Sequence, residues 1–287
     1  MERDSTVQTF KTAITLALVC SIAVSSLAVG LKSTQEKKKA EFRQKNILKA
    51  AGLLDDESDI SGAGVSELFS ERITTRVLDL DTGKITDRYE PGDPAIEVKA
   101  ALRDSELSDP IDGGSRTGRD VAGIRRRETY ATIYEVRDGS QLQTLVLPIR
   151  GYGLWSTLWG FIAVDVSGDV SSPDELQVKG LTYYEHKETP GLGGEVDNPL
   201  WKQKWPGKRI YDESWNVDLE VTKGAEGEYE VDALSGATIT SNGVSNMLEY
   251  WLGQYGYRPY LKTVLSQRSS AADNSTTGDS EATTVAE

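Results

Sequence analysis

The chain has 287 residues, a formal net charge of −13 and 38% hydrophobic residues, which is enough apolar material for a folded body. The acidic balance argues against a nucleic-acid-binding protein, because a phosphate backbone is bound by clustered Lys and Arg. The single cysteine, Cys20, excludes an intrachain disulfide framework and an iron–sulfur cluster held by this chain alone, and the single histidine, His186, excludes a multi-histidine metal site. We therefore predict no metal site, and redox work by this chain needs an organic cofactor.

The first predicted element is a membrane helix at residues 12–31, after a short flank at residues 1–11. This segment contains no charged side chain, and about twenty residues cross a hydrocarbon core of roughly 30 Å. A cleaved signal peptide is the alternative, because Ser26-Leu27-Ala28 resembles a cleavage site. The apolar run is longer than the usual apolar h-region of a signal peptide, so we expect a retained, single-pass anchor.

A helical juxtamembrane segment is expected at residues 32–54, with its end near Gly52. Its basic residues raise the question of orientation, because the positive-inside rule taken literally places the following body in the cytoplasm. The basic residues are Lys32, Lys37, Lys38, Lys39, Arg43 and Lys45, against Arg3 and Lys11 on the other side.

The soluble domain is predicted at residues 55–268 and opens with an acidic, turn-rich loop at residues 55–65. Strands at residues 72–80 and 84–89 bracket Asp81-Thr82-Gly83, which indicates a hairpin. Residues 90–95 contain two prolines and break regular structure. The charged, glycine-rich residues 103–127 are expected to form an exposed loop.

From Tyr130 onward the pattern changes to strands. Residues 130–136 and 142–149 flank Asp138-Gly139, a hairpin dipeptide. The further expected elements are a glycine-aromatic loop at 151–155, an apolar strand at 160–166, a segment at 176–186 that begins helix-like and becomes a strand, and strands at 217–222 and 229–231 around a turn at 223–227.

The last predicted element is a helix that begins just after Thr240, with Ser241 or Asn242 as its N-cap. Apolar residues recur along it at the spacing of a helix with one buried face: Val244, Met247, Leu248, Trp251 and Leu252. Residues 269–287 are Ser, Thr, Ala and acidic residues, typical of a solvated tail, and we predict no structure there. The fold class is thus α+β: one transmembrane helix, then a mixed domain with an antiparallel sheet.

Residues 232–243 carry the most chemical information. They place small residues and hydroxyls at the mouth of an amphipathic helix, where unpaired N–H groups suit a phosphate. The hydroxyl of Thr240 could hold a phosphate by hydrogen bond or be esterified to it. A helix cap without a ligand is the alternative. The candidate neighbours of the phosphate are Ser235, Gly236, Ala237, Thr238, Ser241 and Asn242.

The run Ser-Gly-Ala-Thr-Ile-Thr at residues 235–240 resembles the flavinylation motif of the FMN-binding domain family, whose final threonine carries FMN through a phosphoester bond. The chain as a whole resembles the C subunits of the Na⁺-translocating NADH:quinone oxidoreductases. This resemblance covers the membrane helix, the 160–166 strand, the 188–194 loop and the flavinylation motif. It implies covalent FMN on Thr240 and an FMN-binding part at about residues 130–260.

The loop at residues 188–194 is the second expected contact with the flavin. Its glycines permit close backbone approach to a flat ring, and Leu192 offers an apolar contact. A tight surface turn is the alternative. The expected contact residues are Glu188, Thr189, Gly191, Leu192 and Gly193. His186 and the tryptophans Trp155 and Trp159 lie near these segments, and the sequence leaves their roles open.

The resemblance implies an electron-relaying subunit of a six-subunit complex in the bacterial inner membrane. The chain has no strand–GxGxxG–helix unit, so we expect NADH to bind to another subunit, and we assign no catalytic residue here. In this family the flavin domain is periplasmic and a flavin transferase attaches FMN from FAD there. The periplasmic side disagrees with the cytoplasmic side that the positive-inside rule gives from the lysines. We adopt the periplasmic side because the resemblance implies it.

Two alternatives stay open at this point. The G subunit of an ion-pumping ferredoxin:NAD⁺ oxidoreductase shares both motifs. A cofactor-free, anchored extracytoplasmic binding or scaffold domain is the alternative from another class. Fluorescence of the denatured protein, made together with its flavin transferase, separates the flavoproteins from the scaffold.

Overall fold

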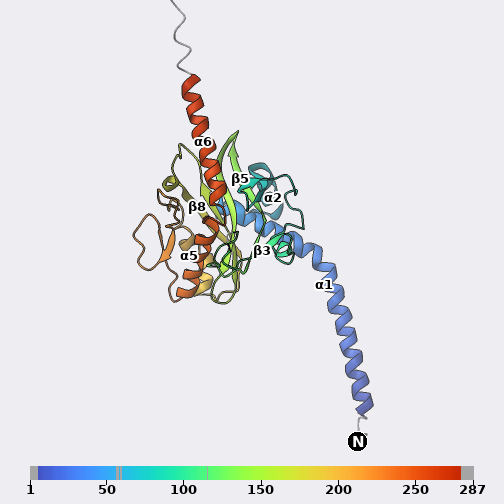
Figure 1. Cartoon of the computed structure of the whole chain (residues 1–287). Coiled ribbons are helices and arrows are strands. Elements are labelled where there is room, and N and C mark those ends of the chain that lie inside the picture. Colours follow the sequence, from blue (N-terminus) through green and yellow to red (C-terminus); the bar gives the residue numbers. More distant parts are fainter. Residues whose placement is uncertain (1–5, 56–57, 59, 115, 279–287) are drawn as a thin grey trace, which may run out of the picture. The chain divides into compact units, whose positions relative to one another are not determined.

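The structure, a computed structural model, describes residues 6–55, 58, 60–114 and 116–278 (Figure 1). The chain forms two compact units, Met1–Arg43 and Gln44–Glu287. Helix α1 (Thr6–Ala50) contains the predicted membrane segment and the juxtamembrane segment. Its apolar stretch is long enough to cross a membrane, and side chains such as Leu18 and Ile22 are exposed. The predicted N-terminal helix is confirmed, and it fits a membrane anchor.

The second unit is built on an antiparallel sheet of six strands in the order β2-β1-β5-β6-β7-β8. Long hairpins join β5 to β6 and β6 to β7, so the centre of the sheet comes from one continuous stretch of chain. The strands are β1 (Ile73–Asp79), β2 (Lys84–Ile85), β5 (Tyr130–Asp138), β6 (Gln141–Tyr152), β7 (Thr157–Asp165) and β8 (Gln177–Glu185). This confirms the predicted α+β class with an antiparallel sheet.

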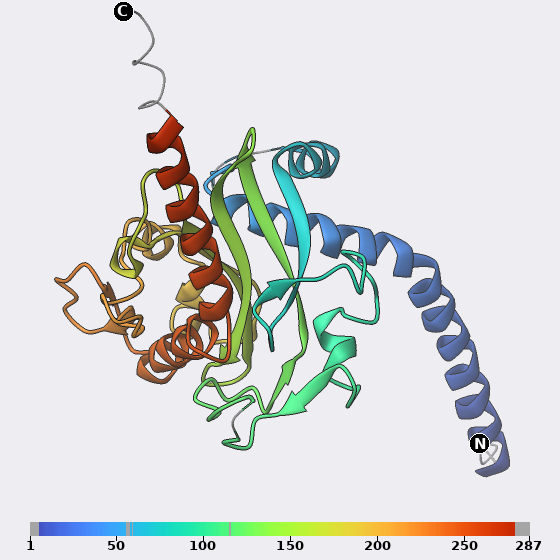
Figure 2. The ribbon, with the colours of Figure 1, turned by 45° about the horizontal axis from the view of Figure 1, so that its top comes forward.

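The two faces of this sheet are covered by different helices (Figure 2). Alternate residues of β6 point to opposite faces, as the period of a strand requires. Leu145 and Leu147 join the larger core with α5 (Thr238–Leu252) and α6 (Arg258–Gly278), whereas Val146 joins the smaller core with the last turns of α1. Both faces of the central strand are therefore buried.

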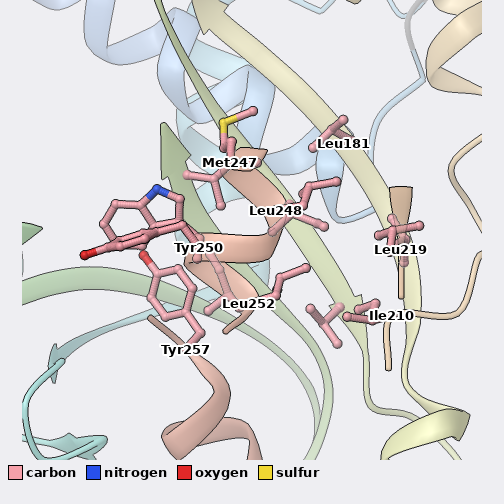
Figure 3. Packing of buried hydrophobic residues seen from close by; sticks show 14 of the residues in the cluster. Leu181, Ile210, Leu219, Met247, Leu248, Tyr250, Leu252 and Tyr257 are labelled. Carbon is pink, nitrogen blue, oxygen red and sulfur yellow. The ribbon is translucent and has the colours of Figure 1, made fainter. Parts of the chain in front are cut away.

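Helix α5 brings its apolar stripe into the larger core. Met247, Leu248 and Trp251 are fully buried, and Leu248 and Leu252 lie near Leu181 of β8 and near Ile210 (Figure 3). The indole Nε1 of Trp251 donates to the carbonyl oxygen of Arg150 at 2.7 Å, which ties the helix to β6. Nearer the start of the helix, a Cβ on Gly243 would stand 2.4 Å from the carbonyl oxygen of Tyr152, so the first half of α5 also lies against the end of β6.

A buried ion pair lies beneath α5. Arg150 Nη1 donates to Glu128 Oε1 at 2.7 Å, and the two side chains are 4% and 2% exposed. The guanidinium carbon of Arg150 is also 4.9 Å from the centre of the Trp251 ring. The two charges therefore compensate each other inside the core.

Smaller elements connect the sheet to the rest of the unit. The short strands are β3 (Ser108–Pro110) with β4 (Arg126–Glu128), which are antiparallel, and β9 (Glu220–Thr222) with β10 (Glu230–Asp232), which are parallel. The short helices are α2 (Gly62–Arg72), α3 (Val98–Ala101), α4 (Pro199–Lys202) and the 3-10 turns Pro173–Glu175 and Gly193–Asp197.

Two expectations for the first half of the unit were wrong. Helix α2 begins inside the predicted 55–65 loop, because Ser61 caps it by accepting from the backbone N–H of Gly64. The segment 103–127 contains β3 and part of β4, and Arg127 is buried with its guanidinium on Asp81. A charge-rich segment is predicted to be exposed because the oppositely charged residue that it pairs with lies far away in the sequence.

The later part of the unit differs at three places. The segment 176–186 holds no helical start, because β8 occupies it as a strand that pairs with β7. Helix α5 begins at Thr238 with Ala237 as N-cap, so Ser241 and Asn242 are not caps. Helix α6 continues to Gly278, into the tail for which we predicted no structure, since no glycine or proline interrupts it after its first turn. The rest of that tail, residues 279–287, lies outside the described residues.

Candidate functional site

Thr240 lies in the first turn of α5 with its side chain directed into the protein. The residue is 1% exposed, and its hydroxyl Oγ1 donates to Glu188 Oε2 at 2.8 Å. The N-cap residue, Ala237, has no side chain able to accept from the N–H groups of the first turn, and no acidic residue occupies that turn. The start of α5 thus combines free backbone donors with a hydroxyl held by a carboxylate.

Glu188 is held by a different loop, which joins β6 to β7. The backbone N–H groups of Trp155 and Ser156 donate to Oε1 at 3.0 and 3.1 Å, and that of Leu154 donates to Oε2 at 3.2 Å. Burial raises the pKa of the carboxyl, but the hydroxyl of Thr240 and these N–H groups outweigh it, so the pKa lies below its usual range. Glu188 is therefore an anion at neutral pH.

Glycines let the three segments come close. A Cβ on Gly193 would stand 2.6 Å from Thr240 Oγ1 and 2.8 Å from Glu188 Oε2, and a Cβ on Gly153 would stand 2.8 Å from Glu188 Oε1. Neither position has room for a side chain. The 188–194 loop, the 153–156 loop and the start of α5 therefore meet around one hydroxyl.

An exposed apolar rim borders this meeting point. It consists of one or two residues from each of the three segments, and each is exposed although large and hydrophobic. The rim residues are Leu154, Trp155, Leu192 and Ile239. Leu192 also reaches the helix entrance, since a Cβ on Gly236 would stand 3.1 Å from Leu192 Cδ2. Such a rim suits a flat, largely apolar ligand next to a polar anchoring point.

The structure brings together some of the predicted contact residues. Glu188 and Gly193 touch Thr240, and Leu192 reaches Gly236. Ser241 is different, because its hydroxyl accepts from the N–H of Leu234 and donates to the carbonyl of Ala237 inside the core. Its role is to hold the segment before α5.

The remaining predicted residues lie around the site. Ser235, Thr238 and Asn242 are exposed at the helix entrance, and Ala237 is its buried N-cap. Thr189 contributes its carbonyl, which accepts from the N–H groups of Leu192 and Gly194 and so closes the turn that contains Gly191. None of these side chains meets Thr240 as Glu188 does.

His186 supports the loop from outside. Its Nε2 is 2.8 Å from Asp197 Oδ2, and its Nδ1 accepts from the N–H of Glu188 at 3.2 Å. The hydrogen bond with Asp197 raises the pKa of the imidazole. His186 therefore orients the backbone of Glu188 without reaching Thr240.

The sequence analysis missed the residues that hold Glu188. Ser156 donates to Glu188 through its N–H, and its Oγ accepts from the N–H of Lys187 at 2.8 Å. Leu154 also donates through its backbone N–H, and Gly153, which has no side chain, leaves room for the carboxylate. The glycines of the run Gly-Tyr-Gly-Leu-Trp at 151–155 indicate that another segment comes close. A backbone N–H can donate whatever the side chain is, so the sequence does not show which residues bind Glu188.

Comparison with known proteins assigns the family. The FMN-binding domain family matches residues 153–253, a segment that includes the 153–156 loop, Glu188 and Thr240. The C subunit of the Na⁺-translocating NADH-quinone reductase from Yersinia pestis is 42% identical over 266 residues, covering 91% of this chain and 94% of that protein. The corresponding Pseudomonas aeruginosa protein is 43% identical over 265 residues, covering 90% and 96%.

The chain belongs to the family of C subunits of the Na⁺-translocating NADH-quinone reductases. The crystal structure of NqrC from Shewanella oneidensis agrees, with a TM-score of 0.64, 28% identity and coverage of 82% of this chain and 99% of that one. The predicted resemblance to this family is confirmed. These relatives carry the name of the NADH–quinone enzyme, which favours it over the ferredoxin:NAD⁺ alternative.

Proposed function

We propose that the chain is an electron-carrying subunit of a Na⁺-translocating NADH:quinone oxidoreductase and carries FMN through a phosphoester bond to Thr240. The observation that supports this most is the position of Thr240. It is a hydroxyl at the uncapped start of a helix, inside the FMN-binding match and held by a carboxylate. A cofactor-free scaffold would have no need of that arrangement.

The residues present fit FMN. The first-turn N–H groups of α5 suit the phosphate, because a helix N-terminus favours negative charge. Trp155, Leu192 and Ile239 offer apolar surface of the kind that a flavin ring covers. Esterified Thr240 would require the turn at Gly193 to withdraw, since this turn now stands against Oγ1.

The role of this chain is to hold the cofactor and to set its surroundings. FMN, when bound, supplies reversible electron transfer. The apolar rim would shield part of the ring from water, and the anion Glu188 together with the helix start would influence the reduction potential of the flavin. We expect NADH to bind to another subunit, so that this chain passes electrons between partners.

The setting is part of the proposal. We propose five partner subunits in a bacterial inner membrane, a single membrane pass through α1 and a flavin domain on the periplasmic side, where a flavin transferase attaches the cofactor.

The exposed turn at Lys223 allows a test of the side of the membrane on which the domain lies. In a Cys20→Ser background, Lys223→Cys should react with a membrane-impermeant maleimide in intact spheroplasts; protection until the cells are lysed would place the domain in the cytoplasm.

The covalent bond is tested by mass and fluorescence. The full chain, made in cells that express a flavin transferase, should show a fluorescent band on a denaturing gel, and its mapped peptide should carry FMN on Thr240. Thr240→Ala should be dark. Thr238→Ala is the matched control, because it removes an exposed hydroxyl two residues earlier on the same helix and should stay fluorescent. A dark wild-type band would favour the scaffold.

A further inference from the structure

The start of α5 presents several hydroxyls, and they differ in what they contact. Among these hydroxyls, as the described part of the chain shows them, only that of Thr240 donates to a carboxylate, Glu188. Ser241 is committed to backbone groups inside the core. Ser235 and Thr238 are exposed to water. Composition alone would not choose among these hydroxyls, so the choice must come from the surroundings.

The carboxylate of Glu188 is fixed and charged. Three backbone N–H groups, those of Leu154, Trp155 and Ser156, hold it at 3.0 to 3.2 Å. The hydroxyl of Thr240 and these N–H groups together keep its pKa below the usual range despite burial. At neutral pH the group is therefore an unprotonated carboxylate, and its Oε2 lies 2.8 Å from the hydroxyl oxygen of Thr240, where it can accept a proton.

Access to the oxygen is blocked on one side by the turn that contains Gly193. This turn is separate from the anchor of the carboxylate, which lies on the 153–156 loop, and the backbone before it is fixed by Ser156 Oγ through the N–H of Lys187. Gly191 has a positive φ of 76°, a conformation that costs glycine little. Withdrawal of the turn would therefore leave the hydrogen bonds that hold the Glu188 carboxylate on the 153–156 loop unchanged.

We propose that Glu188 accepts the hydroxyl proton of Thr240 as the phosphoester forms, and thereby selects this hydroxyl for attachment of the flavin. The inference rests on the proposed function and adds a residue to it. Thr240 Oγ1 forms a bond to the flavin-side phosphorus of a flavin dinucleotide. The bond from this phosphorus to the bridging oxygen of the diphosphate breaks, AMP leaves, and the proton passes to Glu188 Oε2. The transferase supplies the dinucleotide.

The test compares rates of attachment to the full chain in detergent, with a purified flavin transferase and flavin adenine dinucleotide, read by fluorescence on denaturing gels. At pH 7, Glu188→Gln should be modified about 10²-fold more slowly than the wild type, because a positioned base contributes about that factor or more. Glu188→Asp keeps a carboxylate on a shorter stem and should retain part of the rate. A Glu188→Gln protein modified at the wild-type rate would overturn the proposal.

The pH dependence separates a proton acceptor from a structural support. Glu188 stays charged between pH 6 and 9, so its contribution to the rate of attachment is constant. In the glutamine variant, the rate of attachment depends on hydroxide as the proton acceptor. The wild-type to Glu188→Gln rate ratio should therefore fall about tenfold per pH unit, while the ratio for Glu188→Asp should stay constant. Taking ratios removes the pH dependence of the transferase itself, because the transferase acts on the wild type and on each variant in the same way. A constant ratio for Glu188→Gln means a structural role and contradicts the proposal.

The result also distinguishes this inference from the proposed function. If the wild type acquires no flavin on Thr240, the phosphoester itself is absent and both ideas fail. If the wild type is modified at Thr240 and Glu188→Gln is modified equally well, only the role of Glu188 fails. Peptide mapping of each product shows which hydroxyl has reacted.

Discussion

Two buried carboxylates of this protein have opposite surroundings. Glu128 lies against the guanidinium of Arg150 beneath α5, and the charges cancel. Glu188 makes no ion pair among those found in the described part of the chain and is stabilised by N–H groups and by the hydroxyls of Thr240 and Ser156. The charge of a carboxylate paired with a cation is compensated, whereas a carboxylate stabilised only by neutral donors remains a net anion that can accept a proton from a reacting hydroxyl. The first arrangement suits structure and the second suits chemistry.

The largest expected effect follows from breaking the paired site. Arg150→Met leaves Glu128 buried without its cation, so the free energy of unfolding should fall by about 3–5 kcal/mol. Chemical denaturation followed by tryptophan fluorescence measures it. The double variant Arg150→Met/Glu128→Gln removes both charges and should recover part of the loss. A single variant as stable as the wild type would show that the pair is not buried as described.

Removing the unpaired carboxylate should cost less. Glu188→Ala leaves the N–H groups of residues 154–156 without their acceptor, at about 1–3 kcal/mol in total, because water can reach an exposed loop. The same denaturation experiment applies. A loss larger than that of Arg150→Met would reverse our ranking of the two sites.

The difference between Glu128 and Glu188 can be tested further through the pKa of Glu188. Its folded pKa is lowered, so the stability that it contributes is present above its unfolded pKa and is lost as the pH falls through the folded pKa. Thr240→Val removes the hydroxyl that donates to it and should raise this pKa, moving the loss of stability to higher pH. Carboxyl NMR titration measures the shift, and an unchanged pKa would mean that the hydroxyl contributes nothing.

The smallest effect is expected at His186. Asp197 raises the pKa of the imidazole, so the stability from this pair is present below the unfolded pKa of histidine and is lost as the pH rises through the folded pKa. Asp197 is half exposed, so the contribution should stay below about 1 kcal/mol. Asp197→Asn should lower the pKa. The chain has one histidine, so its NMR signal needs no assignment, and an unshifted titration would contradict the contact.

Much of the sheet could be predicted because its turns have local chemistry. Asp138-Gly139 and Asp81-Thr82-Gly83 mark hairpins that the structure contains, and the apolar stripe of α5 marked its buried face. Helix α2 was missed because glycines at its start conceal the cap formed by Ser61. Strand order could not be predicted, since pairing such as that of β1 with β5 joins distant parts of the chain.

The site was predictable as a set of residues but not as an arrangement. The motifs at 188–194 and 235–240 identified Glu188 and Thr240 separately, and nothing in their spacing indicates a hydrogen bond between them. The N-cap preference of Ser241 and Asn242 placed the start of α5 after Thr240, whereas in the structure Ser241 bonds to Leu234 and Ala237 and the helix starts at Thr238. Tertiary contacts therefore decided whether the hydroxyl faces a carboxylate or water.

The last turns of α1 limit where the chain can be shortened. Ile47, Leu48 and Ala50 are buried in the smaller core, and the carbonyl of Asn46 accepts from Thr182 Oγ1 on β8. A water-soluble fragment for crystallisation or titration should therefore begin before Gln44. A fragment cut after Ala50 would leave Phe161 and Val146 facing water and should aggregate, even though every residue of the FMN-binding match is still present.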